Sequence, residues 1–232
     1  MDEKQIIIKM KKTLLFGLVL IIGGIANAQI SEKYGLRIGG GISNQYWEYH
    51  KLTNLTGWKE NKPGLSIYFN GEKTLTSYLS IRPEIGYLSK GFREALVFSD
   101  VYGEITETRT MDIVFNNLSG NLGFKISPID FIVKPYLILG IRGNYMFDYK
   151  DFEIEYQGVT YGIYNSLIDD FNKFTLSGLV GAGIEYRNLL FLDFEYNPAV
   201  TKNFHGTGLS ITDKYYGLTL GLNIFRAAGV RQ

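Results

Sequence analysis

The chain of 232 residues contains no cysteine. This absence excludes structural disulfides, thiolate metal sites and a lipoprotein anchor, which requires a cysteine. Only five residues are proline, and no run of about twenty apolar residues is present, so the sequence predicts no membrane-spanning helix. The net charge of +1, without any basic cluster, excludes nucleic acid as a partner.

The N-terminal segment has the three parts of an export signal. Lys9, Lys11 and Lys12 form a basic region, Leu14 to Ile25 form a short apolar region, and Ala26-Asn27-Ala28 matches an A-x-A cleavage site. We therefore predict a cleaved signal peptide over 1–28 and one domain over 29–232. Met10 is an alternative start, because the preceding residues are acidic near the terminus and do not fit a signal peptide.

The remaining sequence alternates apolar and polar side chains in stretches of about ten residues, rich in Tyr, Phe and Gly. Such alternation with period two is typical of half-buried β-strands, and no long helical period of 3.6 appears. The predicted strands cover eight segments: Tyr34 to Asn44, Lys62 to Gly71, Ser77 to Lys90, Arg109 to Ser127, Phe131 to Phe147, Asn172 to Arg187, Leu189 to Asn197 and Lys214 to Phe225.

The links between these strands alternate in length. Short links are predicted at Glu72 to Thr76, around Pro128 and Asp130, and at Arg187-Asn188, whereas the other links are long. Bacterial outer-membrane barrels have short periplasmic turns, longer extracellular loops and an even number of strands. The order of the links therefore favours an antiparallel up-and-down barrel.

Each strand separates into an apolar face and a polar face, since side chains alternate across a strand. In the second strand, for example, Leu65, Ile67 and Phe69 oppose Ser66, Tyr68 and Asn70. Four basic and four acidic residues lie on the polar faces in mid-strand. They are Arg37, Arg82, Glu84, Lys125, Arg142, Glu185, Asp193 and Glu195.

These charges fix the direction in which each face points. An Arg or Lys that faces lipid at mid-membrane costs about 2 to 4 kcal/mol, so four outward cations would consume the net stability of a domain, about 5 to 15 kcal/mol. We predict an all-β, eight-stranded transmembrane barrel in the outer membrane, with the charges inside and paired. A soluble periplasmic β-sandwich is the alternative fold, since it would bury the apolar face between two sheets.

The chain resembles the small porin-like or PorT-like outer-membrane β-barrel proteins. The resemblance is carried by Lys62 to Phe92 (KPGLSIYFNGEKTLTSYLSIRPEIGYLSKGF) and continues through Asn116 to Ile126, Lys134 to Tyr145, Leu176 to Tyr186 and Tyr215 to Phe225. It implies an outer-membrane location and an eight-stranded barrel of a Gram-negative-type cell. The family's namesake is associated with protein secretion and gliding, but no motif here carries that role.

The resemblance also implies two kinds of partner, namely outer-membrane lipid with lipopolysaccharide and the outer-membrane assembly machinery. That machinery often reads an aromatic residue at the end of a barrel. In this chain Arg226 to Gln232 follow Phe225, so Phe225 would have to serve from an internal position.

Three function classes remain open. The sequence favours a plugged structural or interaction barrel, because eight strands enclose a space that side chains fill; its long loops, with Trp47 and Trp58, are candidates for contact with a protein or glycan partner. A narrow porin-like pore is the alternative. A lipid-modifying enzyme is the third class, in which Ser210 or Asp213 would approach His205. Without a spaced catalytic motif, we expect no enzyme, no cofactor and no metal site.

Overall fold

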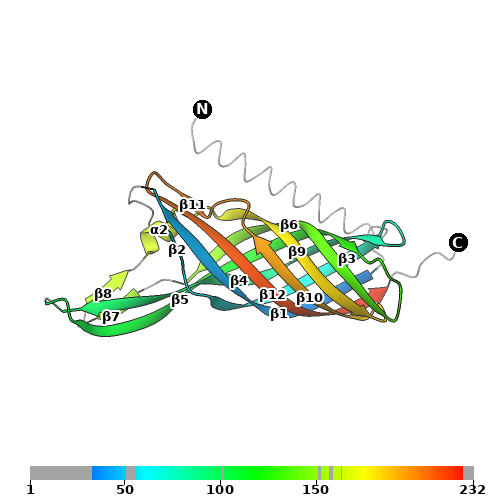
Figure 1. Ribbon diagram of the computed structural model, residues 1–232, viewed down its shortest axis with the longest axis horizontal. Helices are drawn as coiled ribbons and strands as arrows, with labels where there is room; N and C mark the ends of the chain where they lie inside the picture. The colour runs from blue at the N-terminus through cyan, green and yellow to red at the C-terminus, as the bar shows by residue number, and fades with distance from the viewer. Residues whose placement is uncertain are drawn as a thin grey trace, which may run out of the picture.

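The computed structural model describes residues 33–50, 56–100, 102–150, 153–156, 159–162 and 164–226. Over this range the chain forms one elongated β-barrel (Figure 1). The predicted signal peptide, residues 1–28, lies outside the described residues.

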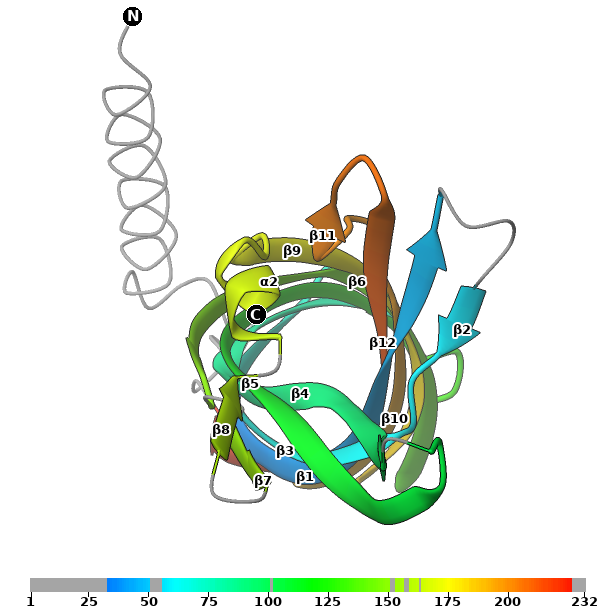
Figure 2. The same cartoon turned by 90° about the vertical axis from the view of Figure 1, so that its left-hand side faces the viewer.

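The barrel consists of eight long strands that follow one another around a ring. They are β1 (Lys33–Tyr49), β3 (Lys62–Thr74), β4 (Leu79–Ser99), β5 (Ile105–Ile126), β6 (Val133–Tyr149), β9 (Phe174–Tyr186), β10 (Leu190–Pro198) and β12 (Leu209–Arg226). Every neighbouring pair is antiparallel, and β12 pairs with β1, which closes the ring (Figure 2). The predicted eight-stranded antiparallel barrel is therefore confirmed.

The two ends of the barrel differ in their connections. Strands β3 and β4, β5 and β6, and β9 and β10 are joined by 75–78, 127–132 and 187–189, which form the short-turn end. Arg187 and Asn188 have φ values of 51° and 57°, which suits the tight turn of a two-residue hairpin. The other links form the long-loop end.

Five short elements that the sequence did not predict lie in the long loops. They are β2 (Thr56–Trp58), β7 (Glu153–Tyr156), β8 (Val159–Gly162), α2 (Asn165–Asp169) and β11 (Phe204–His205). Of these, β2 pairs with β1, β11 pairs with β12, and β7 pairs with β8. The described residues include no helix long and apolar enough to cross a bilayer.

Strands β4 and β5 extend further than the sequence predicted. Their pairing continues from Arg93↔Asp112 to Ser99↔Ile105, so the two strands form a hairpin that projects at the long-loop end (Figure 1). We call residues 93–112 the arm. The predicted strands ended at Lys90 and began at Arg109, because the arm is exposed on both faces and lacks the apolar and polar alternation.

The apolar face of each strand points outward and the polar face points inward. Leu65 is 46% exposed and Leu218 is 56% exposed, whereas Tyr68 and Arg37 are buried. Of the aromatic residues on the outer wall, Tyr145 and Tyr186 are partly exposed near the ends of β6 and β9, where amphipathic rings favour the bilayer interface. A soluble sandwich would bury the apolar face, but the closed ring turns it outward over the whole wall.

Candidate functional site

All eight charged residues predicted on the polar faces lie inside the barrel, and each is no more than 6% exposed. The structure adds four further charged residues that form ion pairs in this interior. They are Lys33, Glu72, Lys90 and Asp213. The twelve side chains separate into three groups along the bore, which we call the middle, lower and upper layers.

The middle layer contains three arginines and three carboxylates. They are Arg37, Arg82, Arg142, Glu84, Asp193 and Glu195. Arg37 is the centre of the layer, because its Nη2 lies 2.7 Å from Glu84 Oε2 and its Nη1 lies 3.2 Å from Asp193 Oδ2. Since the three positive charges balance the three negative charges, the layer as a whole is neutral.

Neutral side chains add hydrogen bonds to the middle layer. Asn121 Nδ2 donates to Glu84 Oε2 at 2.6 Å, and Asn121 Oδ1 accepts from Arg142 Nε at 2.7 Å. The Tyr136 hydroxyl donates to Asp193. The guanidinium of Arg37 also lies 4.5 Å from the centre of the Tyr68 ring, a distance at which cation–π attraction is effective.

The lower layer lies toward the short-turn end and contains two lysines and two glutamates. Lys33 Nζ is 2.8 Å from Glu185 Oε1 and 3.3 Å from Glu72 Oε1, and Lys125 Nζ is 2.8 Å from Glu72 Oε2. Lys125 also contacts Glu185. The sequence missed Lys33 and Glu72 because the first precedes the predicted strand and the second was assigned to a turn.

The upper layer is the single ion pair of Lys90 with Asp213. Lys62 is also buried here, and its Nζ donates to the Pro63 carbonyl at 2.9 Å. The sequence missed Asp213 as an interior residue because β12 begins five residues earlier than predicted. Asp213 is paired with Lys90 inside the barrel, so it does not serve as the partner of His205 that the enzyme hypothesis required.

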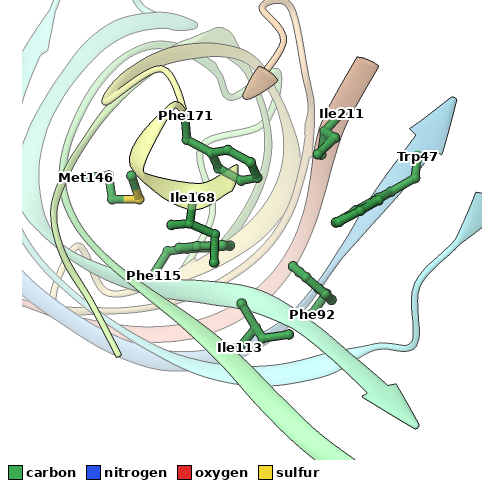
Figure 3. Close-up of a cluster of buried hydrophobic side chains, with 8 residues drawn as sticks. All are labelled: Trp47, Phe92, Ile113, Phe115, Met146, Ile168, Phe171 and Ile211. Carbon is green, nitrogen blue, oxygen red and sulfur yellow. The ribbon is translucent and has the colours of Figure 1, made fainter. Parts of the chain in front are cut away.

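An apolar cluster closes the bore above the upper layer (Figure 3). We call it the cap; it consists of Trp47, Phe92, Ile113, Phe115, Met146, Ile168, Phe171 and Ile211. Ile168 belongs to α2 and Phe171 follows it, so the long loop before β9 supplies two of the side chains that fill the mouth. Figure 2 shows α2 at this mouth.

The space between the middle layer and the cap is small. A cavity of about 10 Å³ lies there, among Arg142, Lys90, Asp213 and Tyr215. That volume holds about one water molecule. In the described part of the chain, the side chains of the three layers and of the cap thus occupy the bore at four successive levels, as expected for an eight-stranded barrel.

The sequence placed both tryptophans in a long loop, but the structure gives them different environments. Trp47 is part of β1 rather than a loop, and it is 3% exposed because it packs against Phe92 and Tyr164 in and beside the cap. The structure therefore places Trp47 in the packing of the mouth and not on an exposed surface, and a contact role for the tryptophans stays a prediction. Trp58 is 48% exposed, with Lys214 Nζ 3.5 Å from its ring centre.

The other candidates for chemistry are also placed. Asp193 and Glu195, a pair of carboxylates on one strand face, are both bound to arginines of the middle layer. Ser210 Oγ lies 2.9 Å from His205 Nδ1. Within the part of the chain that the structure describes, no three His, Asp or Glu side chains are grouped as a metal site would require.

Residues 16–224 match the model of the family described as the outer membrane protein beta-barrel domain. Among solved structures, the chain is similar to Ail of Yersinia pestis (12% identity, 82% of this chain and 99% of that chain, TM-score 0.33). It is also similar to OprG of Pseudomonas aeruginosa (10%, 85% and 98%, 0.45) and to OmpW of E. coli (11%, 84% and 100%, 0.41). Ail has also been solved in complex with the heparin analogue sucrose octasulfate.

No curated protein matches the sequence. The family match supports the outer-membrane β-barrel part of the resemblance, and the porin-like and PorT-like parts stay predictions. Because the matched region takes in nearly the whole ring of eight strands, the chain belongs to the outer membrane β-barrel family and is located in the outer membrane.

Proposed function

We propose that the protein is a closed, structural barrel that does not conduct solutes and that presents its long-loop end to a partner outside the cell. The observation that carries the proposal is the filled bore, in which three neutral layers of ion pairs lie beneath an apolar cap. The protein would then act through its surface, and not as an enzyme or a passage.

The energetics of the layers support a closed bore. Buried charges persist only when they are paired and hydrogen-bonded, and removal of one partner from a buried pair costs about 3 to 5 kcal/mol. A solute that passed the middle layer would have to separate Arg37 or Arg142 from Glu195, and both ion pairs are fully buried. The narrow pore is therefore the less favoured function.

Planar-bilayer conductance tests the closed bore. We expect the purified wild-type protein to give no steady open-channel steps. A variant with Arg37→Ala and Arg142→Ala, which removes two large side chains from the middle layer, should conduct more than a Lys173→Ala control, because Lys173 is exposed and lies outside the bore. Large, steady steps from the wild type would contradict the proposal.

The exposed aromatic surface around Trp58 is the proposed contact with a partner. Tyr46 packs against Trp58 with ring centres 4.8 Å apart, and Lys214 covers the other part of this surface at 3.5 Å from the Trp58 ring. Partly exposed aromatic side chains next to a cation are enriched where proteins bind partners. A protein or a glycan fits this surface.

Crosslinking on intact cells tests the contact. We expect Trp58→Ala to reduce recovery of a crosslinked partner, and Tyr102→Ala to leave it unchanged. Tyr102 is a matched control, because it is an aromatic residue 88% exposed at the tip of the arm. Equal recovery from both variants and the wild type would show that the Trp58 surface is not the contact.

A further inference from the structure

A group of nitrogen-bearing side chains surrounds one serine at the long-loop end. His50 Nε2, His205 Nδ1 and Lys202 Nζ lie 2.8, 2.9 and 3.0 Å from Ser210 Oγ. Ile211 is buried in the cap, so Ser210, its neighbour on β12, faces the outside of the barrel. We call these four residues the Ser210 cluster.

The serine hydroxyl cannot balance the nitrogens that surround it. A hydroxyl offers one hydrogen and two lone pairs, so these three contacts use its whole capacity. Because all three nitrogens touch the same oxygen atom, any two of them lie within about 6 Å, a separation at which like charges repel strongly outside bulk water. The cluster therefore gathers two imidazoles and a lysine ammonium around one neutral hydroxyl.

No carboxylate is paired with this cluster in the part of the chain that the structure describes. Lys202, His50 and His205 form no ion pair there. The lysines of the lower and upper layers, in contrast, are paired with glutamates or with an aspartate. Glu48 of β1 lies opposite Ser210 of β12 in the strand register. No ion pair joins the Glu48 carboxylate to the three nitrogens in the described residues. Within the described residues, no ion pair therefore neutralises the Lys202 ammonium.

The cluster is open to a ligand from outside. His50 and His205 are both exposed, on the adjacent β1 and β11 edges of β12, with ring centres 6.4 Å apart. Ser210 is 3% exposed beneath them. The two imidazoles are thus accessible at the surface, and the hydroxyl that they contact is buried beneath them.

We propose that the Ser210 cluster binds a phosphate group. Charge-assisted hydrogen bonds from lysine and protonated histidine to phosphate oxygens are short and strong. A phosphate offers several acceptor oxygens on a tetrahedron, so it can accept from three nitrogens that are not in one plane, whereas a carboxylate has only two oxygens. The group could come from a phosphorylated lipid of the outer leaflet or from a free phosphate, and the site chemistry is the same.

Titration with inorganic phosphate, in a detergent that contains no phosphate, tests the site in the whole protein. We expect the Lys202→Gln, His205→Gln double variant to bind about tenfold or more weakly than the wild type. Lys173→Gln removes one exposed cation at the same end of the barrel and should bind as the wild type does. Heat-modifiable gel mobility shows that each variant is folded. Equal affinity of the double variant and the wild type would overturn the proposal.

Two further measurements separate the sources and the chemistry. Binding to vesicles of phosphorylated lipid A, but not of the dephosphorylated lipid, would assign the phosphate to a membrane lipid; binding of inorganic phosphate alone would assign a free ion, and either result supports the site. Covalent labelling of Ser210 by a fluorophosphonate would overturn it, because the cluster would then activate a nucleophile. Loss of phosphate binding would leave the closed bore untouched, since the cluster lies outside the three layers.

Discussion

Removal of the Arg37 guanidinium is the most direct test of the interior. Arg37 is fully buried and touches Glu84, Asp193 and Glu195 of the middle layer. Arg37→Met keeps most of the side-chain volume but leaves two arginines with three carboxylates. The resulting buried negative charge should cost about 3 to 5 kcal/mol, a large part of a net stability of about 5 to 15 kcal/mol.

A second substitution separates the charge effect from the packing effect. Glu84→Gln, combined with Arg37→Met, leaves two arginines and two carboxylates, so the middle layer is neutral again. The ion pair of Arg82 Nη2 with Asp193 Oδ2, 2.5 Å in the wild type, is not altered by either substitution. We expect the double variant to be more stable than Arg37→Met alone, because neutral replacement of a buried pair costs much less than the loss of one partner. The two substitutions should therefore be strongly non-additive.

Urea unfolding in lipid vesicles, followed by tryptophan fluorescence, measures both effects. Trp47 is a suitable reporter, because it is buried in the cap and becomes exposed when the barrel opens. Lys173→Met, a surface change, should fall within about 0.5 kcal/mol of the wild type. The reasoning is refuted if Arg37→Met costs less than about 1 kcal/mol, or if Glu84→Gln brings no recovery.

Three further predictions concern the outer wall, the cap and the arm. Leu218→Arg on the outer wall should cost about 2 to 4 kcal/mol in vesicles, whereas Val97→Arg on the arm should cost almost nothing; equal costs would place the bilayer elsewhere. Ile168→Ala in the cap should lower the free energy of unfolding by about 2 to 4 kcal/mol. This variant should not conduct, because the ion pairs below the cap remain. Channel steps from it would show that the cap is the barrier and that the ion pairs are not. The hydrogen bond from Arg93 lowers the pKa of Asp112, so this pair supports the folded arm above the ordinary aspartate pKa of about 3.9 and loses its effect as the pH falls below it. The protection of the arm amides, after correction for the intrinsic exchange rate at each pH, should therefore fall more in acid for the wild type than for Asp112→Asn, and an equal fall in both would contradict the assignment.

The strand bounds show where pattern reading succeeds and where it ends. The strand predicted over Lys62 to Gly71, which the structure extends to Thr74, and its neighbours were recognised because one face had to meet lipid and the other had to be enclosed. The arm was missed because its two strands, which pair with each other from Arg93↔Asp112 onward, enclose no interior and lie next to no lipid-facing wall. Without an inside and an outside, alternation has no cause.

The interior set shows the same limit at the level of single residues. Mid-strand charges such as Arg142 and Glu195 were identified because only the polar face could hold them. Lys33, Glu72 and Asp213 stand near strand ends, where a charge could equally reach solvent, so their enclosure depends on the exact register of the ring. The Ser210 cluster depends on it still more, since His50 and His205 meet only because β1 and β12 pair across the closure.

The sequence alone determined the eight strands, the lipid-facing and enclosed faces, and the outer-membrane class, since these follow from a period of two and from the cost of a charge in hydrocarbon. Only the tertiary structure decided which charged residues pair with each other and that the cap fills the mouth. It also decided that Trp47 is buried while Trp58 is about half exposed. These features arise from contacts between residues far apart in the chain, whose distances are set when β12 joins β1 and the ring closes.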